Sequence, residues 1–462
     1  MVRAAMGALT ESVLDFLCGD LPARAPEKAR RIAVTGFIDC IGVALAGADQ
    51  PVVRNLLKSD GGGKPEARLL LSGERMPAAA AALIGSAAAH ALDLDDYAFG
   101  NHTSAVLVPP ILAEAEVVGA SGARMIEAYL AGFEVWSVLA GRERDYMQGA
   151  GWHPTGVYGP VAAAAALSRL RGMSMDETRN ALGLAVAAGA GVMDNFGTQA
   201  KPYQAARAAE AGVTAVRRAL AGLDAGPDAL DGAGGFLKVI SPSGRVDRAS
   251  AASDLGEDWY MAEHGLNIKR YPVVGAAQRC VDAALQLHAD HGPDVAAIEH
   301  VTARISRDHS SVMQFRMPAD AMQAKFSLEF AVAAPLIFGR LGFAEMRDDC
   351  VRRDDLQALM RKVEREEGPD DDPVYPVGAR HDTVGVVLDD GTALKSEPVH
   401  RYRGHGQNPL SQDELRAKFM NCATVTGAVP EDAAADLYEC LWRLEELSGV
   451  VEIPEISILS GY

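Results

Sequence analysis

Alanine-rich segments with helical spacing extend from the N-terminus to about residue 260, and they constrain the fold more than any other feature of the chain. Residues 121–142 place Tyr129 and Phe133 on one stripe, which is the spacing of an amphipathic helix. Runs of small residues at 162–166 and 185–190 would allow neighbouring helices to approach closely. This part of the sequence predicts a tightly packed helical bundle rather than a sheet protein.

Two capping-box sequences mark helix starts. Ser174 with Glu177 opens a helix that we expect to continue to about residue 192. Ser411 with Glu414 opens another helix, and residues 437–447 repeat apolar side chains at helical spacing. The C-terminal segment is therefore predicted to return to the helical domain.

The pattern changes after about residue 265. Residues 298–305 alternate like a strand, and strands predicted at 383–388 and 392–398 flank an Asp390-Gly391 turn, which is a strong hairpin signal. Helical spacing returns at 326–338 and 354–366. These alternating elements indicate a small α+β domain inserted in a helical protein.

The predicted fold class is therefore mainly α with an α+β lid. A large all-helical domain is formed by both termini, and a smaller α+β domain is inserted between its parts. The predicted boundaries are 1–265 for the helical domain, 266–402 for the lid domain and 403–462 for the C-terminal helices that complete the helical domain.

Composition and charge exclude several classes of function. The formal net charge is −18, and an acidic protein lacks the basic surface that nucleic-acid binding needs. Glu11 and Asp15 interrupt the apolar pattern near the N-terminus, which favours an amphipathic helix over a signal peptide. Residues 76–92 are mostly alanine and too weakly apolar for a membrane span. We expect a soluble, cytoplasmic protein that binds neither nucleic acid nor a membrane.

The first polar cluster in apolar surroundings covers residues 90–104. Asp93 and Tyr97 are four residues apart, so we expect them to share one helix face. His102 directly precedes an apolar run, and carboxylates beside an imidazole can form a tuned acid–base pair. The alternative is the end of a helix with solvated acids.

Three further clusters carry cationic or imidazole side chains. His153 precedes a proline at a helix start, Lys201 lies in a loop that contains glycine, and Lys269 with Arg270 lies at the predicted domain junction. Lysine and arginine there could bind carboxylates, or form an interdomain salt bridge. Neither a metal-ligand set nor a nucleotide motif accompanies them. Together the clusters predict a metal-free pocket for an anionic ligand between two domains.

A resemblance extends this interpretation. The segments HALDLDDYAFGNHTSAVLVPP, GWHPTGVYG, DNFGTQAKPYQAARAAEAGV, IKRYP, AKFSLEFAVAA and NPLS followed by ELRAKF resemble, in order, the signatures of the MmgE/PrpD family. That family includes 2-methylcitrate dehydratase, cis-aconitate decarboxylase and iminodisuccinate epimerase. The resemblance runs from about residue 10 to 450, and it implies a helical domain with an α+β lid, a homodimer, and catalysis without a metal or organic cofactor.

The resemblance also implies site residues. The family's active-site positions fall on Asp93, His102, His153, Lys201 and Lys269, with Arg270 as a neighbouring anion contact. The sequence departs from the family pattern at Tyr97, Gln278 and Phe330, which are expected to line the substrate site. Decarboxylating relatives carry Thr and Tyr at the first and third of these positions, and many members carry His at the second, which favours another carboxylic acid over cis-aconitate.

The implied chemistry is proton removal beside a carboxylate of a small di- or tricarboxylate. His102 is expected to be the acid–base group, with Asp93 orienting it, and His153 to protonate a departing hydroxyl. Lys201 and Lys269 are expected to hold substrate carboxylates. A hydro-lyase resembling 2-methylcitrate dehydratase is the first interpretation. An epimerase or isomerase resembling iminodisuccinate epimerase is the second, and a catalytically silent carboxylate-binding protein is the third.

Overall fold

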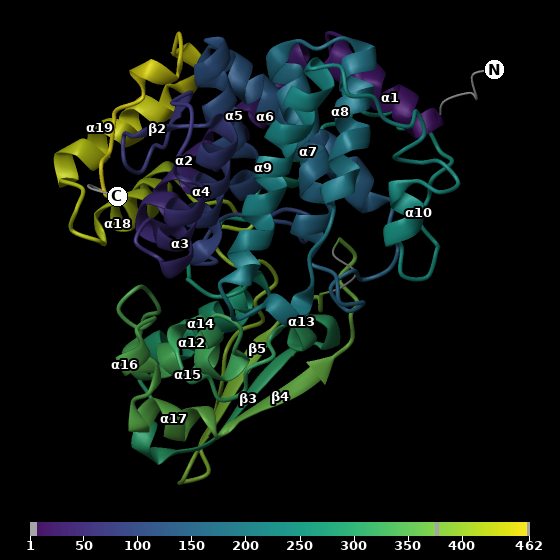
Figure 1. Cartoon of the computed structure of the whole chain (residues 1–462). Helices are drawn as coiled ribbons and strands as arrows, with labels where there is room; N and C mark the ends of the chain where they lie inside the picture. Colours follow the sequence, from purple (N-terminus) through teal and green to yellow (C-terminus); the bar gives the residue numbers. More distant parts are fainter. Residues whose placement is uncertain (1–6, 375–377, 460–462) are drawn as a thin grey trace. The chain divides into compact units, whose positions relative to one another are not determined.

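The structure, a computed structural model, describes residues 7–374 and 378–459, and the chain forms two compact units (Figure 1). The larger unit contains the described parts of 1–194, 199–267 and 411–462. The smaller unit contains residues 195–198 and the described parts of 268–410. The predicted fold class is confirmed, because the chain is mainly helical and its four-stranded sheet is confined to the smaller unit.

Residues 403–410 were predicted to belong with the C-terminal helices, but they pack within the smaller unit. The Ile268 N–H donates to the Gly404 carbonyl at 2.8 Å. The Arg403 N–H donates to the Asp282 carboxylate at 3.1 Å. These hydrogen bonds join the end of this unit to its beginning.

The described part of the larger unit contains helices and a short two-stranded ribbon. Its helices are α1 (Ala8–Cys18), α2 (Glu27–Gly47), α3 (Pro51–Asp60), α4 (Ala78–Ala91), α5 (Thr103–Val118), α6 (Gly122–Gly141), α7 (Pro154–Arg171), α8 (Met175–Ala185), α9 (Ala200–Leu220), α10 (Phe236–Ile240), α11 (Tyr260–His264), α18 (Gln412–Thr424) and α19 (Glu431–Trp442). The ribbon pairs β1 (Ala67–Arg68) with β2 (Arg75–Met76).

Helix α7 forms the centre of the larger unit. Its residues 162–166 are five consecutive alanines without solvent exposure, and α5, α6 and α9 pack around them. Because α7 is buried on every side, it carries small or apolar side chains on all of its faces. The helices that follow Ser174 and Ser411 begin with the predicted capping boxes. Helix α8 ends at Ala185, earlier than predicted, because a 3-10 turn and the Gly189–Gly191 segment follow it.

Small residues bring α7 and α9 into close contact. A Cβ atom at Gly212 of α9 would lie 2.4 Å from the Cβ atom of Ala163. We therefore expect Gly212→Ala to lower the free energy of unfolding by about 1–3 kcal/mol, the usual cost of overpacking, in urea titrations. Gly141→Ala is the matched control, because a Cβ atom at this helical glycine has no neighbour within 4 Å. Equal losses in both variants would contradict close packing of α7 and α9.

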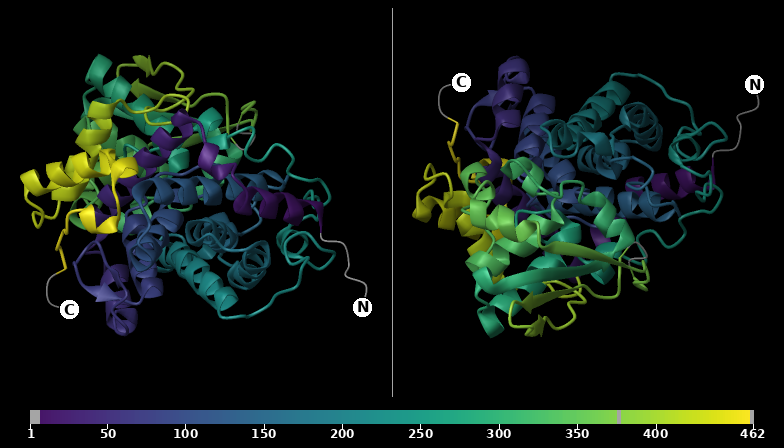
Figure 2. Two further views of the ribbon diagram at one scale, coloured as in Figure 1. Left: turned by 90° about the horizontal axis from the view of Figure 1, so that it is seen from above. Right: turned by 90° about the horizontal axis from the view of Figure 1, so that it is seen from below.

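The C-terminal helices complete the larger unit. Helices α18 and α19 lie beside α2, although most of the chain separates them in sequence (Figure 2). Lys418 of α18 donates hydrogen bonds to the Asp39 carboxylate of α2 and to the Leu94 carbonyl, the latter at 2.9 Å. Helix α18 is thereby bonded to the loop that follows α4.

The smaller unit contains a four-stranded sheet in the order β4-β3-β5-β6. Strand β3 pairs in parallel with β4 and antiparallel with β5, and β5 pairs antiparallel with β6 through the predicted Asp390-Gly391 turn. The elements are α12 (Gln278–His291), β3 (Ile298–Ser306), α13 (Arg307–Val312), α14 (Ala321–Ala324), α15 (Leu328–Phe338), α16 (Asp348–Val351), α17 (Asp354–Met360), β4 (Val363–Gly368), β5 (Thr383–Leu388) and β6 (Ala393–Lys395).

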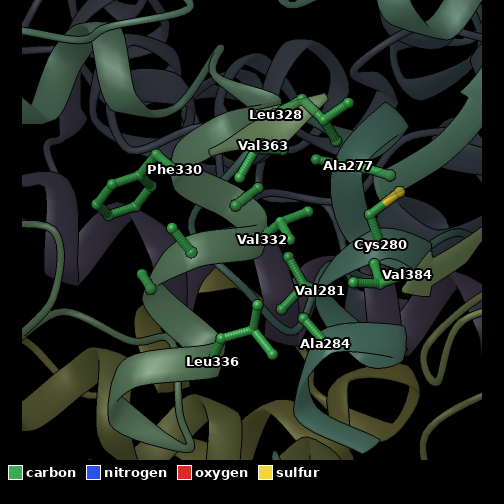
Figure 3. Close-up of a cluster of buried hydrophobic side chains, with 14 of the residues drawn as sticks. Ala277, Cys280, Val281, Ala284, Leu328, Phe330, Val332, Leu336, Val363 and Val384 are labelled. Carbon is green, nitrogen blue, oxygen red and sulfur yellow. The ribbon is translucent and has the colours of Figure 1, made fainter. Parts of the chain in front are cut away.

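The predicted helix over 354–366 is wrong in its second half. Helix α17 ends at Met360, and Val363 begins β4, where it pairs with Val301 of β3. Pairing with a strand distant in sequence therefore overrides the local helical pattern. Helices α12 and α15 cover this sheet with apolar side chains, among which Val281 faces Val332 (Figure 3).

Within the described residues, no single helix is both long and apolar enough to cross a membrane. Helices α2 and α3 reach that length and apolar composition only when taken together, and their axes are bent by 89° relative to each other. Residues 34 and 36–47 of α2 are buried inside the larger unit, as expected for a core helix.

Candidate active site

Three helices of the larger unit begin beside one another. His102 is the N-cap of α5, His153 is the N-cap of α7, and Lys201 is the second residue of α9. His90 lies in the last turn of α4. The centroid of its ring lies 4.1 Å from that of His102 and 6.1 Å from that of His153. The Lys201 Nζ lies 3.0 Å from the His90 Nε2. Unpaired N–H groups and the helix dipole make such helix starts favourable for anions.

The loop after α4 supplies the acidic groups. Helix α4 ends at Ala91, and Asp93 has a left-handed backbone with φ of 54°. The prediction that Asp93 and Tyr97 share a helix face is therefore wrong, because the helix has ended before either residue. A left-handed backbone is uncommon for a residue other than glycine, and such strain is concentrated at functional sites.

Asp93 forms a buried ion pair with Lys201. The Lys201 Nζ donates to the Asp93 Oδ1 at 2.7 Å, and both side chains are almost fully buried. The His102 Nε2 lies 3.5 Å from the same oxygen, which is too long for a strong hydrogen bond. Asp93 is therefore primarily the partner of Lys201.

Asp95 is the closer carboxylate partner of His102. Its Oδ2 lies 2.9 Å from the His102 Nδ1, and both of its oxygens lie 3.1 Å from the His90 Nδ1. Burial opposes ionisation of Asp95, but the electrostatic attraction and hydrogen bonds from His102 and His90 hold its pKa well below the usual range. We expected Asp93 to orient His102, whereas the geometry gives this role to Asp95.

His90 and His153 are both held in the neutral form. Burial lowers the pKa of His90, and the charge of Lys201 lowers it further. Burial also lowers the pKa of His153 well below its usual range, and Lys201 again contributes. The Gln204 amide donates to the His153 Nδ1 at 2.9 Å, while its oxygen accepts the Val192 N–H at 2.8 Å. A neutral His153 that accepts at Nδ1 carries its proton on Nε2.

Asp96 has the opposite charge preference to Asp95. Burial, together with the neighbouring charge of Asp39, raises the pKa of Asp96 to about 8. Its Oδ1 accepts from the Thr103 hydroxyl at 3.2 Å and the Ser104 N–H at 3.4 Å. Near neutral pH Asp96 is therefore mainly a neutral acid, although it is adjacent to the ionised Asp95.

His90, Asp93, Asp95 and His102 each offer a ligand atom, and these four atoms lie within 4.8 Å of one another. Two imidazoles and two carboxylates are a suitable donor set for zinc. The Lys201 ammonium, however, already neutralises Asp93 and contacts His90. A dication would have to displace this ammonium and the imidazole protons, so the donor set fits a charge-balanced hydrogen-bond network better than a resident metal.

Four of the predicted site residues belong to the smaller unit. Lys269 has no solvent exposure, whereas Arg270 is exposed and its guanidinium lies 5.7 Å from the centroid of the Tyr271 ring. Gln278 uses its whole amide group on the backbone of residues 270–273, with four hydrogen bonds of 2.8–3.3 Å. Its side chain therefore fixes the segment that follows Lys269.

Phe330 is a core residue of the smaller unit. It has no solvent exposure, and its ring lies on the opposite side of α15 from Val332 (Figure 3). In the larger unit, the ring centroid of Tyr97 lies 6.4 Å from that of His102. The backbone of Tyr97 pairs with Asn267 through hydrogen bonds of 3.0 and 2.9 Å. Tyr97 therefore lies beside the imidazole cluster of the larger unit.

Sequence reasoning did not select His90, Asp95 or Gln204. His90 ends an alanine-rich helix and resembles a core histidine, while Asp95 is one of three acids in a four-residue segment. The available signal was the His-x-x-Asp-x-Asp spacing, which places two acids shortly after an imidazole. Gln204 follows Lys201 by three residues, so it lies on the same face of α9.

Two family models and several known proteins match this chain. The MmgE/PrpD N-terminal domain matches residues 9–249, and the MmgE/PrpD C-terminal domain matches residues 271–443. Human cis-aconitate decarboxylase is 25% identical over 97% of this chain and 93% of its own length. The mouse enzyme is 27% identical over 81% of this chain and 77% of its own length. The 2-methylcitrate dehydratase of Salmonella typhimurium is 27% identical over 45% of this chain and 44% of its own length.

Proposed function

The chain belongs to the MmgE/PrpD family, and on that premise we propose that it is a lyase that acts on a small di- or tricarboxylate. Decarboxylases and dehydratases are both lyases, so the relatives agree on this class of enzyme. The observation that carries the proposal is the buried cluster in which the Lys201 ammonium lies within 3.0 Å of His90, whose ring adjoins those of His102 and His153. A homodimer and a cytoplasmic location stay predictions.

Substrate binding in this proposal is electrostatic. Lys201 and the starts of α5, α7 and α9 provide positive potential for one carboxylate of the substrate. Removing a proton beside that carboxylate builds additional negative charge on its oxygens, and a preorganised ammonium stabilises that charge. We propose Lys269 as a second carboxylate ligand and Arg270 as a further anion contact, as the resemblance implies.

His102 is proposed as the base. Its Nδ1 lies 2.9 Å from the Asp95 carboxylate, which accepts hydrogen bonds only, so the proton of a neutral ring is on Nδ1. Its Nε2 then carries the lone pair that removes the proton from substrate carbon.

His153 is proposed as the proton donor for the leaving group. A ring that accepts from Gln204 at Nδ1 presents its proton on Nε2. In a dehydration, the C–O bond breaks as the new C=C bond forms, and the departing hydroxide takes this proton and leaves as water. In a decarboxylation, the C–C bond to a carboxylate breaks instead, its electron pair stays on the substrate, and carbon receives a proton from the Nε2 of His153 or of a protonated His102.

The three departures bear on which acid is the substrate. Gln278 and Phe330 form part of the internal structure of the smaller unit, so their identity gives weaker evidence against cis-aconitate than we expected. Tyr97 remains a proposed specificity residue because its ring lies close to His102, with 6.4 Å between the two ring centroids. A dehydratase that resembles 2-methylcitrate dehydratase stays our first candidate, and decarboxylation of cis-aconitate is the reaction to compare with it.

Turnover of named acids tests the proposal. Purified protein is incubated separately with 2-methylcitrate and with cis-aconitate, and alkene formation is followed by ultraviolet absorbance while CO₂ is measured. We expect at least one acid to be converted, with alkene and water from the first or with CO₂ from the second. Binding of both acids by calorimetry without conversion would contradict the lyase proposal and favour a silent binding protein. Inversion at carbon without alkene or CO₂ would favour an epimerase.

A further inference from the structure

Asp95 is a fully buried carboxylate, and it contacts two imidazoles. Its side chain has no solvent exposure. The His90 Nδ1 lies 3.1 Å from each of its oxygens, and the His102 Nδ1 lies 2.9 Å from Oδ2. A buried carboxylate is stable only when paired, so both imidazoles contribute to keeping Asp95 ionised.

This geometry determines where both rings carry a proton. An ionised carboxylate accepts hydrogen bonds and donates none, so both Nδ1 atoms must be protonated. The Nε2 of neutral His90 then has a lone pair that accepts from the Lys201 ammonium at 3.0 Å. Asp95 is connected through His90 to Lys201, and directly to His102.

We propose that Asp95 is the positioning residue of the active site: it fixes His102 and His90 in the Nδ1-protonated form, and His90 in turn orients Lys201. The kinetic part of this inference rests on the proposed function. Asp95 touches neither substrate nor a reacting atom in this scheme. It acts through the two groups that we propose to remove the proton and to stabilise the resulting charge.

Neither neighbouring aspartate can replace Asp95 in this role. The Asp93 carboxylate lies 2.7 Å from the Lys201 Nζ and 3.5 Å from the His102 Nε2. It therefore faces Nε2 of the His102 ring and not Nδ1. Asp96 bonds to Thr103 and Ser104 at the start of α5. Three acids within four residues therefore have three different partners.

The Asp95→Asn variant tests the proposal. An amide has nearly the same size as a carboxylate. It has one acceptor oxygen and two N–H donors, whereas the carboxylate accepts through two oxygens. The amide either turns an N–H donor towards one Nδ1–H group or accepts from both rings through one uncharged oxygen, so the Nδ1-protonated forms lose their ionic acceptor. We expect kcat to fall roughly 10²- to 10⁴-fold, as when the residue that orients a catalytic imidazole is replaced, while KM changes less than about 3-fold.

The matched control is Asp96→Asn. Asp96 is mainly a neutral acid near neutral pH, and an amide preserves its acceptor oxygen towards Thr103 and Ser104. We expect kcat within about 3-fold of the parent. Equal losses of kcat in the two variants would overturn the proposal, because they would indicate a general sensitivity of this loop to substitution.

A spectroscopic readout separates this inference from the proposed function. Nitrogen-15 NMR of histidine-labelled protein, without any acid added, reports which ring nitrogen is protonated. The parent is expected to show Nδ1-protonated His90 and His102, assigned with His90→Gln and His102→Gln variants. Nε2-protonated rings in the parent would overturn the inference even if Asp95→Asn fails to fold. If the parent converts neither acid, the proposed function fails while the NMR result still decides the role of Asp95.

Discussion

Replacing Lys201 by methionine is expected to lower kcat/KM by about 10³-fold or more. The change removes the ammonium that would stabilise charge on the substrate carboxylate. It also leaves Asp93 buried without its partner at 2.7 Å. Steady-state kinetics with the acid that the parent converts provides the measurement. Lys58→Met is the control, because Lys58 is an exposed lysine in the last turn of α3 and should give parental rates.

A double variant separates the two roles of Lys201. Asp93→Asn combined with Lys201→Met removes both charges of the pair, so it is expected to recover much of the folding stability that Lys201→Met loses. It should not recover turnover, because the ammonium is still absent. Recovery of parental turnover in the double variant would show that Lys201 serves only as the counter-ion of Asp93.

Replacing His102 by glutamine is expected to lower kcat roughly 10²- to 10⁴-fold, the usual contribution of a positioned acid–base group. Glutamine preserves size and a hydrogen-bond donor towards Asp95, but it cannot remove a proton from carbon. Substrate affinity, measured by calorimetry, should change less than about 3-fold because Lys201 stays in place.

The control for this variant is His291→Gln, at the exposed end of α12. It should convert the acid at the parental rate. A His102→Gln protein with parental kcat would assign the base to another residue, and His153→Gln would then be the next variant to measure.

Local sequence signals predicted much of the fold. The capping boxes at Ser174 and Ser411, and the hairpin at Asp390-Gly391, depend on residues close together in the chain. The second half of the predicted helix at 354–366 failed because Val363 pairs with a strand about 60 residues earlier, which local spacing cannot reveal. Family membership, inferred from six ordered motifs, is confirmed by the matched domains.

The candidate site was predicted less completely than the fold. Asp93, His102, His153 and Lys201 were all named from the sequence, and the larger unit brings them together with His90. The choice of carboxylate for His102 depends on the left-handed backbone of Asp93, which turns the chain so that Asp95 reaches the ring. Spacing along an assumed helix could not indicate this turn.

Hydrogen exchange at the substrate carbon tests the central claim most directly. The acid that the parent converts is incubated in D₂O with parent protein and with His102→Gln, and proton NMR follows the hydrogen beside the carboxylate or in the product. We predict deuterium at that carbon with the parent, and an exchange rate at least about 10²-fold lower with His102→Gln. Equal deuterium incorporation by both proteins would contradict the account, because the imidazole at the start of α5 would then not handle the proton.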